Sequence, residues 1–189
     1  GAGGKLQAMA DFSLEASVAL LERTPKAMAA LLGGLPDFWT ESNEGPESWS
    51  PYEVVGHLIH GERTDWMARV RRILQDGETR AFERFDRFAQ QHESRGKALS
   101  ELLQTFSDLR AANLTELRGL GLKPSDLARR GKHPSLGPVT LQQLLATWTT
   151  HDMTHLHQMA RILAHQYRDE VGPWERNLGV LHCTGHGGH

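Results

Sequence analysis

Apolar residues recur at steps of three and four along four long segments of the chain, which is the pattern of amphipathic helices. The four predicted helices cover about residues 13–32, 51–74, 97–117 and 141–167. Their starts carry ordinary signals: Ser50, Pro51 and Glu53 match a capping box with proline at the first helical position, and Thr140 precedes the fourth helix as its cap. No segment shows the clear alternation expected of a strand. The pattern therefore predicts an all-α fold, a four-helix bundle.

Two long connections between the predicted helices imply crossovers in this bundle. The first, residues 77–96, is charged and places Phe82, Phe85 and Phe88 at steps of three, so we expect its aromatic rings to pack over the helices. The second, residues 119–138, is rich in glycine and proline and is predicted to be a loop with one helical turn at "PSDLA".

Length and composition indicate a single ordinary globular domain. The chain has 189 residues, 39% apolar and 23% charged, with a formal net charge of -2, which argues against a nucleic-acid or anionic-membrane partner. No apolar run approaches the roughly 20 residues that span a bilayer. The single cysteine, Cys183, excludes an intrachain disulfide and favours a reducing, cytoplasmic location.

We assign residues 11–175 to the bundle and leave both ends of the chain outside it. Residues 1–10 are interpreted as a cloning remnant with a disordered N-terminus. Residues 176–189 are expected to form a flexible glycine-rich tail, in which Cys183 and the histidines at 182, 186 and 189 would bind metal only adventitiously.

Two histidines of the predicted fourth helix lie on its apolar face. His151 follows Trp148 by three residues, and His155 lies midway between His151 and Met159, so both rings are expected to point inward. His157 is about 240° further round the helix than His151 and should lie off this face. Histidines at i and i+4 can chelate one divalent ion, although hydrogen-bonded core histidines explain the spacing equally well. The glutamate of the protease motif HExxH is missing, so the pair does not indicate a protease.

The predicted second helix offers a third ligand. His57 lies three residues after Val54, on or beside the apolar row, whereas His60 falls one strip away. Three imidazoles from facing helices would leave a coordination position for water or substrate, and this favours a metal site over purely structural histidines. Imidazole ligands suit zinc, nickel, iron and copper alike, so the sequence does not identify the ion.

Two segments of the chain resemble the second and fourth helices of the DinB-like superfamily. They are "WSPYEVVGHLIHGERTDWMARVRRIL" and "VTLQQLLATWTTHDMTHLHQMARIL". The resemblance covers roughly residues 11–175 and implies a four-helix bundle with long crossovers, often a homodimer, that binds one divalent ion (Zn, Ni or Fe) through His57, His151 and His155. Characterised members include thiol S-transferases and an isomerase that use low-molecular-weight bacterial thiols such as bacillithiol or mycothiol, and other members are assigned as metal-dependent hydrolases.

Further polar residues near these histidines are weaker candidates for a site. Glu62 is considered as a general base, Asp152 as an orienting partner of a ligand, and Gln158 as a residue at the edge of a pocket. Arg69 and Arg72 belong to a basic cluster suited to an anionic thiol, although a solvated helix face explains such charges as well.

The sequence thus predicts a metal-dependent enzyme acting on a small molecule, with transfer of a low-molecular-weight thiol as the favoured reaction. A metal-dependent hydrolase is the first alternative. A non-catalytic stress protein that binds metal or a small ligand, and a structural homodimer with hydrogen-bonded core histidines, are the others.

Overall fold

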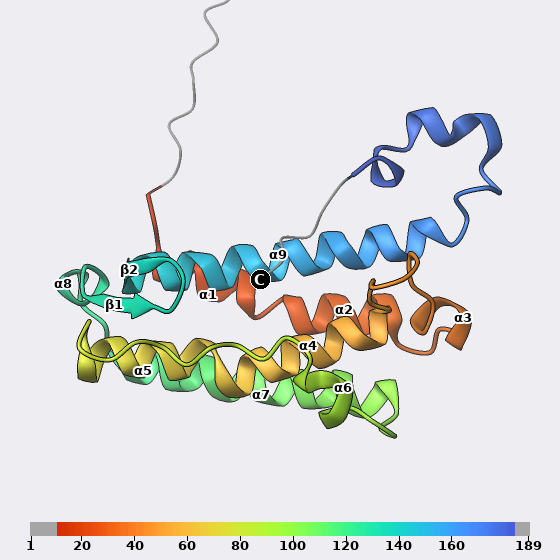
Figure 1. Ribbon diagram of the computed structural model, residues 1–189. Helices are drawn as coiled ribbons and strands as arrows, with labels where there is room; N and C mark the ends of the chain where they lie inside the picture. The colour runs from red at the N-terminus through yellow and green to blue at the C-terminus, as the bar shows by residue number, and fades with distance from the viewer. Residues whose placement is uncertain (1–10, 184–189) are drawn as a thin grey trace, which may run out of the picture.

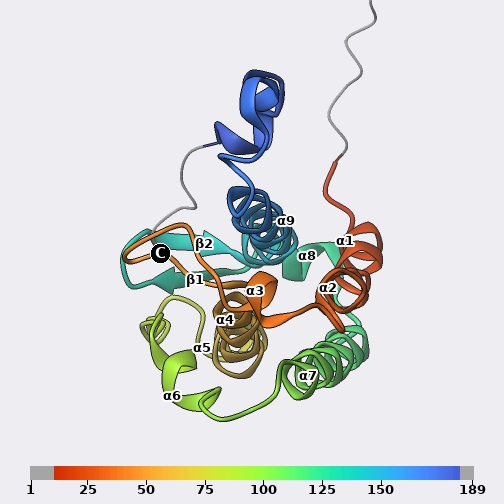
Figure 2. The same cartoon turned by 90° about the vertical axis from the view of Figure 1, so that its right-hand side faces the viewer.

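The computed structural model describes residues 11–183 and confirms the all-α bundle with long crossovers. Four helical rods run side by side (Figures 1 and 2). Two rods are single helices, α7 and α9, and two are broken, α1 with α2 and α4 with α5. The helices and strands are α1 Leu14–Leu21, α2 Thr24–Leu32, α3 Asp37–Thr40, α4 Pro51–Thr64, α5 Trp66–Asp76, α6 Ala89–Glu93, α7 Leu99–Gly119, α8 Pro124–Leu127, β1 Arg130–His133, β2 Gly137–Thr140 and α9 Leu141–His165.

The breaks in two rods are differences from the predicted continuous helices. Pro25 lies in the first turn of α2, where its missing N–H costs nothing, and the chain therefore starts a new helix there. The second break falls at Asp65, which ends α4 and begins α5 with φ -110° and ψ -73°. Apolar periodicity continues across both breaks, so the sequence pattern did not reveal them.

The second connection contains a hairpin that the sequence analysis predicted as loop. Strands β1 and β2 pair antiparallel, from Arg130 with Thr140 to His133 with Gly137. The turn is closed by the His133 ring, whose Nδ1 accepts the backbone N–H groups of Ser135 and Leu136 at 3.1 Å each. Strands of four residues containing glycine and proline have no recognisable alternation, which is why they were missed. The predicted turn at "PSDLA" is present as α8.

The first connection packs its aromatic residues over the bundle as expected, with one exception. Phe82 is buried and its N–H donates to the carbonyl of Lys132 in β1 at 2.9 Å. Gly131 allows this approach, because a Cβ there would lie 2.9 Å from the Phe82 ring. Phe85 is half-buried, whereas Phe88 is exposed, so the expectation is wrong for Phe88. This connection therefore joins the hairpin as a wall beside α5.

Residues 179–183, from the segment predicted as a flexible tail, lie against α9. Two 3-10 helices, Gly172–Asn177 and Gly179–Leu181, follow α9, and Leu181 is buried. Arg161 of α9 donates to the carbonyl of Cys183 at 3.4 Å. Residues 1–10 and 184–189, including His186 and His189, lie outside the described residues. Within residues 11–183, none of the helices has the length and apolar character that crossing a membrane requires.

The apolar core has two parts, one at each end of the bundle. The hairpin-end cluster comprises Val18, Leu21, Trp66, Met67, Val70, Ile73, Phe82, Leu114, Leu117, Leu141, Leu144, Leu145 and Trp148. The α6-end cluster comprises Met28, Leu32, Val54, Val55, Leu58, Ile59, Leu102, Leu103, Phe106, Met159 and Ile162. On three of the rods, buried polar residues lie between the two clusters. They are Glu62 on α4, Arg110 on α7, and Asp152 with His155 on α9. We call these four residues the polar layer.

Arg110 of α7 lies at the centre of the polar layer and donates hydrogen bonds to the other three rods. Its Nε and Nη2 donate to Glu62 Oε1 at 3.0 and 2.8 Å, and its Nη1 and Nη2 donate to the two carboxylate oxygens of Asp152 at 2.6 and 2.9 Å. Its Nη1 also donates to the carbonyl of Leu21 in α1 at 2.8 Å. Burial alone would lower the pKa of Arg110, but the two carboxylates outweigh burial and raise it. The guanidinium therefore stays charged.

Replacing Arg110 by methionine should destabilise the fold strongly, because it leaves the carboxylates of Glu62 and Asp152 buried without a cation. We expect the free energy of unfolding in urea to fall by about 3–5 kcal/mol. Arg118, whose exposed side chain pairs with Glu22, is the matched control, and Arg118→Met should cost less than about 1 kcal/mol. Equal losses in the two variants would contradict a central role for Arg110.

Candidate metal centre

The structure brings together three histidines from two helices. His57 on α4 and His151 with His155 on α9 each place a ring nitrogen within 4.8 Å of the others. The ring centroids of His57 lie 4.7 Å from His155 and 5.6 Å from His151. His157 is exposed, on another face of α9. His60, the other histidine of α4, donates from Nδ1 to Glu93 Oε1 at 3.1 Å and does not join the three.

The three rings are spaced as ligands of one ion would be. Nε2 of His151 and Nε2 of His155 are 3.0 Å apart. Two imidazoles bound tetrahedrally at 2.0–2.1 Å place their nitrogens about 3.3–3.4 Å apart, so a small rotation of either ring suffices to admit a metal. The donor set, three neutral imidazoles from facing helices, is that of an open zinc-type site rather than a closed structural one. The residues present therefore fit a divalent ion.

Gln158 fixes the orientation of one ring of this cluster. Its Oε1 lies 2.7 Å from Nδ1 of His155, and since an amide oxygen only accepts, Nδ1 carries the proton. The lone pair of His155 Nε2 then points toward His151, as a metal ligand requires. Gln158 is buried behind His155, not at the edge of the cavity where the sequence analysis expected it.

Aromatic side chains enclose the histidines. Trp49 and Phe85 lie against the His57 ring, with centroids 4.8 and 5.2 Å away. Trp66 meets the His151 ring edge-on at 5.0 Å and stacks on Trp148 at 5.7 Å. Rings packed in this way restrict rotation of the imidazoles and limit access of water to one side.

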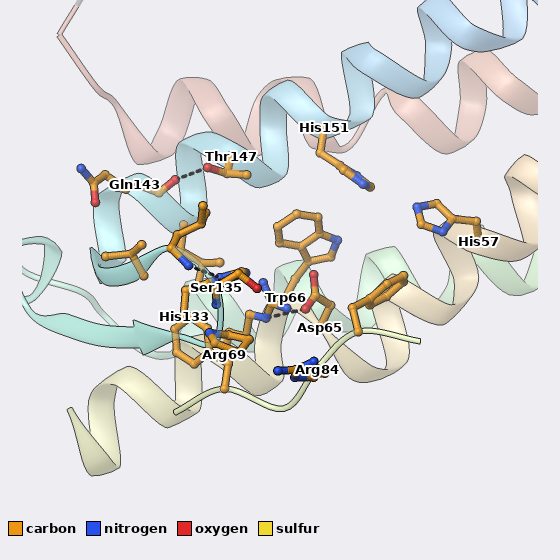
Figure 3. Close-up of a pocket in the computed structure, with 17 residues that line it drawn as sticks. His57, Asp65, Trp66, Arg69, Arg84, His133, Ser135, Gln143, Thr147 and His151 are labelled. Carbon is orange, nitrogen blue, oxygen red and sulfur yellow. Dashed lines mark hydrogen bonds and ion pairs between the residues drawn. The ribbon is translucent and has the colours of Figure 1, made fainter. Parts of the chain in front are cut away.

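A cavity of about 580 Å³ opens beside the cluster. Its walls come from α4, α5, the first connection, the hairpin and α9, and Figure 3 shows His57 and His151 near each other along it. The lining residues are His57, Gly61, Asp65, Trp66, Arg69, Phe82, Arg84, Phe85, His133, Pro134, Ser135, Leu136, Val139, Gln143, Leu144, Thr147 and His151. This volume suits a small-molecule ligand.

Three charged side chains line the cavity. Asp65 and Arg69 form an ion pair, with Oδ1 and Nε 2.5 Å apart, and Arg84 lies nearby in the first connection. Burial raises the pKa of the Asp65 carboxyl, and the charge of Arg69 opposes this rise only in part. Burial and then Arg69 lower the pKa of His133, so this ring is neutral at pH 7. Its Nδ1 acts as an acceptor, in agreement with a neutral ring.

The structure places three other sequence candidates away from the cavity. Glu62 is buried and holds Arg110, Trp148 Nε1 at 3.2 Å and Asn113 Nδ2 at 2.9 Å, so it is neither at a pocket mouth nor on a solvated face. Asp152 is bound by Arg110 and points away from the histidine next to it in sequence. Arg72 pairs with Asp76 and donates to the carbonyl of residue 81. Of the two arginine candidates, only Arg69 lines the cavity.

Sequence reasoning missed the role of Arg110 and gave none to Asp65. A signal for Arg110 was present, because it lies four residues after Phe106 and four before Leu114, on the apolar row of its helix. A charged residue at such a position is buried only with partners. Asp65 had no comparable signal, since its place in the cavity depends on the break between α4 and α5.

Comparisons with known proteins agree with this fold. The model of the DinB superfamily matches residues 20–159. Among solved structures, YfiT from Bacillus subtilis, described as "a probable metal-dependent hydrolase with an unusual four-helix bundle topology", superimposes with a TM-score of 0.70 at 20% identity, covering 89% of this chain and 95% of YfiT. The four-helix bundle protein TT2238 superimposes with a TM-score of 0.52 at 22% identity, covering 76% of this chain and 95% of TT2238. No curated protein matches significantly.

We expect the protein to bind about one zinc ion per chain through this cluster. His57→Ala and His155→Ala should each weaken zinc binding by more than roughly 10- to 100-fold. That range is typical of losing a residue that only hydrogen-bonds to a metal ligand, whereas these variants lose the ligand itself. His157→Ala and His60→Ala are the controls and should bind as the parent protein does. Elemental analysis after dialysis gives the stoichiometry, and competition with a chelating dye gives the affinity. Equal losses in the test and control variants would place the metal elsewhere.

Proposed function

The chain belongs to the DinB superfamily, and from this we propose that it is a metal-dependent hydrolase acting on a small molecule in the cavity beside His57 and His151. The observation that supports this proposal most directly is the three-histidine cluster at a cavity wide enough for a substrate. The description of YfiT as a metal-dependent hydrolase, in a protein of the same fold, points to the same class of reaction.

The chain supplies the parts that hydrolysis needs. The three histidines would hold the ion, and Gln158 keeps His155 in the tautomer that binds it. A divalent ion in such a site lowers the pKa of a bound water or thiol and polarises an ester or amide carbonyl. Trp66 and Phe85 exclude bulk water from one side, which strengthens electrostatic interactions within the site.

Asp65 is the residue of the cavity best suited to move a proton. Its Oδ1 is fixed by Arg69, which orients the carboxylate, and within residues 11–183 no hydrogen bond engages Oδ2. Oδ2 would accept a proton from the attacking water and return it to the leaving group. The raised pKa of Asp65 makes it a stronger base than an exposed aspartate.

Transfer of a low-molecular-weight thiol is the second candidate function. The cavity of about 580 Å³ has room for a thiol and an electrophile together, which hydrolysis of a small ester does not require. Metal-dependent conjugation of an electrophile with bacillithiol or mycothiol, without ester or amide turnover, would favour this reaction over hydrolysis.

Hydrolysis should depend on the bound ion. Chelation should abolish turnover of a responsive substrate from a panel of 4-nitrophenyl esters and 4-nitroanilides, and added zinc should restore it. The same treatment should restore His157→Ala but leave His155→Ala inactive. Absorbance of the released nitrophenol or nitroaniline reports the rate. Turnover that survives chelation, or that zinc restores equally in both variants, would contradict a metal-dependent hydrolase.

Asp65→Asn should lower kcat by about 10²- to 10⁴-fold, the usual contribution of a general base. Because a base acts in its deprotonated form, activity of the parent should fall as the pH drops through the pKa of Asp65. The midpoint of this acid limb should lie above 3.8, the ordinary pKa of an aspartate, and the limb should be absent from Asp65→Asn. Asp76→Asn, a surface change on the same helix, is the control. A limb shared by both variants would assign the base elsewhere.

A further inference from the structure

We propose that the cavity recognises a carboxylate group of its ligand through Arg84, assisted by the terminal nitrogens of Arg69, and that an apolar part of the ligand spans the distance to the histidines. The inference rests on the proposed function in one respect, because it takes the cavity as the substrate site. It adds the chemical class of the substrate: a monocarboxylate with an apolar body.

The charges around the cavity leave one cation uncompensated. Its lining contains two arginines, Arg69 and Arg84, and one carboxylate, Asp65. The ion pair with Asp65 neutralises Arg69, whereas in the described part of the chain no hydrogen bond or ion pair engages Arg84. The remaining lining residues are apolar, neutral or histidine. A ligand with a single negative charge therefore complements this cavity better than a neutral or cationic one.

Both arginines are held by their surroundings. The Arg69 guanidinium lies over the Phe82 ring, 5.2 Å from the ring centroid, and Asp65 binds its Nε. No hydrogen bond from the described residues engages the two terminal nitrogens of Arg69, so they are available to a ligand. Arg84 is exposed, but its backbone is fixed by the buried Phe82 on one side and by Phe85 against His57 on the other. In the view of Figure 3, Asp65, Arg69 and Arg84 lie below the Trp66 ring, and His151 lies above it.

The shape and walls of the cavity specify the rest of the ligand. A guanidinium fork matches the two oxygens of a planar carboxylate, and one net positive charge matches a monoanion better than a dianionic phosphate. Apolar side chains make up much of the lining: Phe82, Phe85, Leu136, Val139 and Leu144. Phe85 follows Arg84 by one residue and its ring lies 5.2 Å from that of His57, so a ligand with its carboxylate at Arg84 meets an apolar side chain on the way to the histidines.

Calorimetric titration of the chelator-treated full-length protein tests the proposal. Metal is removed first because a bound ion would itself attract a carboxylate. The probes are 4-phenylbutyrate, its amide 4-phenylbutyramide, and phenyl phosphate. We expect the carboxylate to bind roughly tenfold more tightly than the amide, because its hydrogen bonds with arginine are charge-assisted. Arg84→Gln should remove most of this preference. Arg87→Gln, an exposed arginine of the same connection that does not line the cavity, should retain it.

Three results would overturn the proposal. These are equal or absent binding of carboxylate and amide, equal effects of Arg84→Gln and Arg87→Gln, and an Arg84-dependent preference for phenyl phosphate over the carboxylate. The metal dependence separates this proposal from the proposed function. Arg84-dependent binding without any metal-dependent turnover would refute only the hydrolase. Metal-dependent turnover with no Arg84-dependent preference for carboxylate esters over neutral esters would refute only the carboxylate site.

Discussion

The buried guanidinium of Arg110 is the interaction on which the rest of the structure depends. Removing a charge from water costs several kcal/mol, and this cost is offset only where the geometry of its partners is excellent. Arg110 meets that condition with two carboxylates and a carbonyl from three other rods, and its guanidinium lies 5.0 and 5.3 Å from the ring centroids of Phe106 and Trp148. Helices with apolar faces can slide along one another at small cost, whereas hydrogen bonds of 2.6–3.0 Å permit one register only.

This register determines where the histidines lie. Asp152 follows His151 directly, and Glu62 lies five residues after His57, so the bonds that fix these carboxylates also fix α4 and α9 beside each other. Glu62 further accepts the indole N–H of Trp148, which stacks on Trp66, and Trp66 contacts the His151 ring. A continuous set of contacts thus connects the centre of the core to a side chain of the histidine cluster. The two carboxylates considered as catalytic candidates serve the site by positioning it.

The sequence predicted the parts of the molecule that depend on helical periodicity. The four rods, the inward faces of His151 and His155, and the choice of His57 over His60 all follow from spacing of three and four residues. The helix breaks, the hairpin and the cavity did not follow, because they depend on contacts between distant segments. Phe82 illustrates this: its aromatic spacing suggested packing, but its partners Gly131 and Lys132 are about fifty residues away along the chain.

The charged candidate residues also depended on contacts that helical spacing does not predict. A helical pattern indicates which face a carboxylate occupies but not whether a cation from another helix neutralises it there. Glu62 was therefore considered as a general base, although it is buried and bound by Arg110. Asp65 is only eight residues from His57, yet it reaches the cavity because α4 ends there.

The histidine cluster and much of the cavity wall belong to different parts of the chain. The three clustered histidines and Arg110, which fixes their register, belong to the long rods, where a change of length would disturb every neighbour. About half of the residues that line the cavity come from the first connection and the hairpin, outside those rods. Such segments tolerate substitution and insertion far better than packed helices do. In a bundle arranged in this way, part of the cavity wall can change while the histidine cluster stays the same.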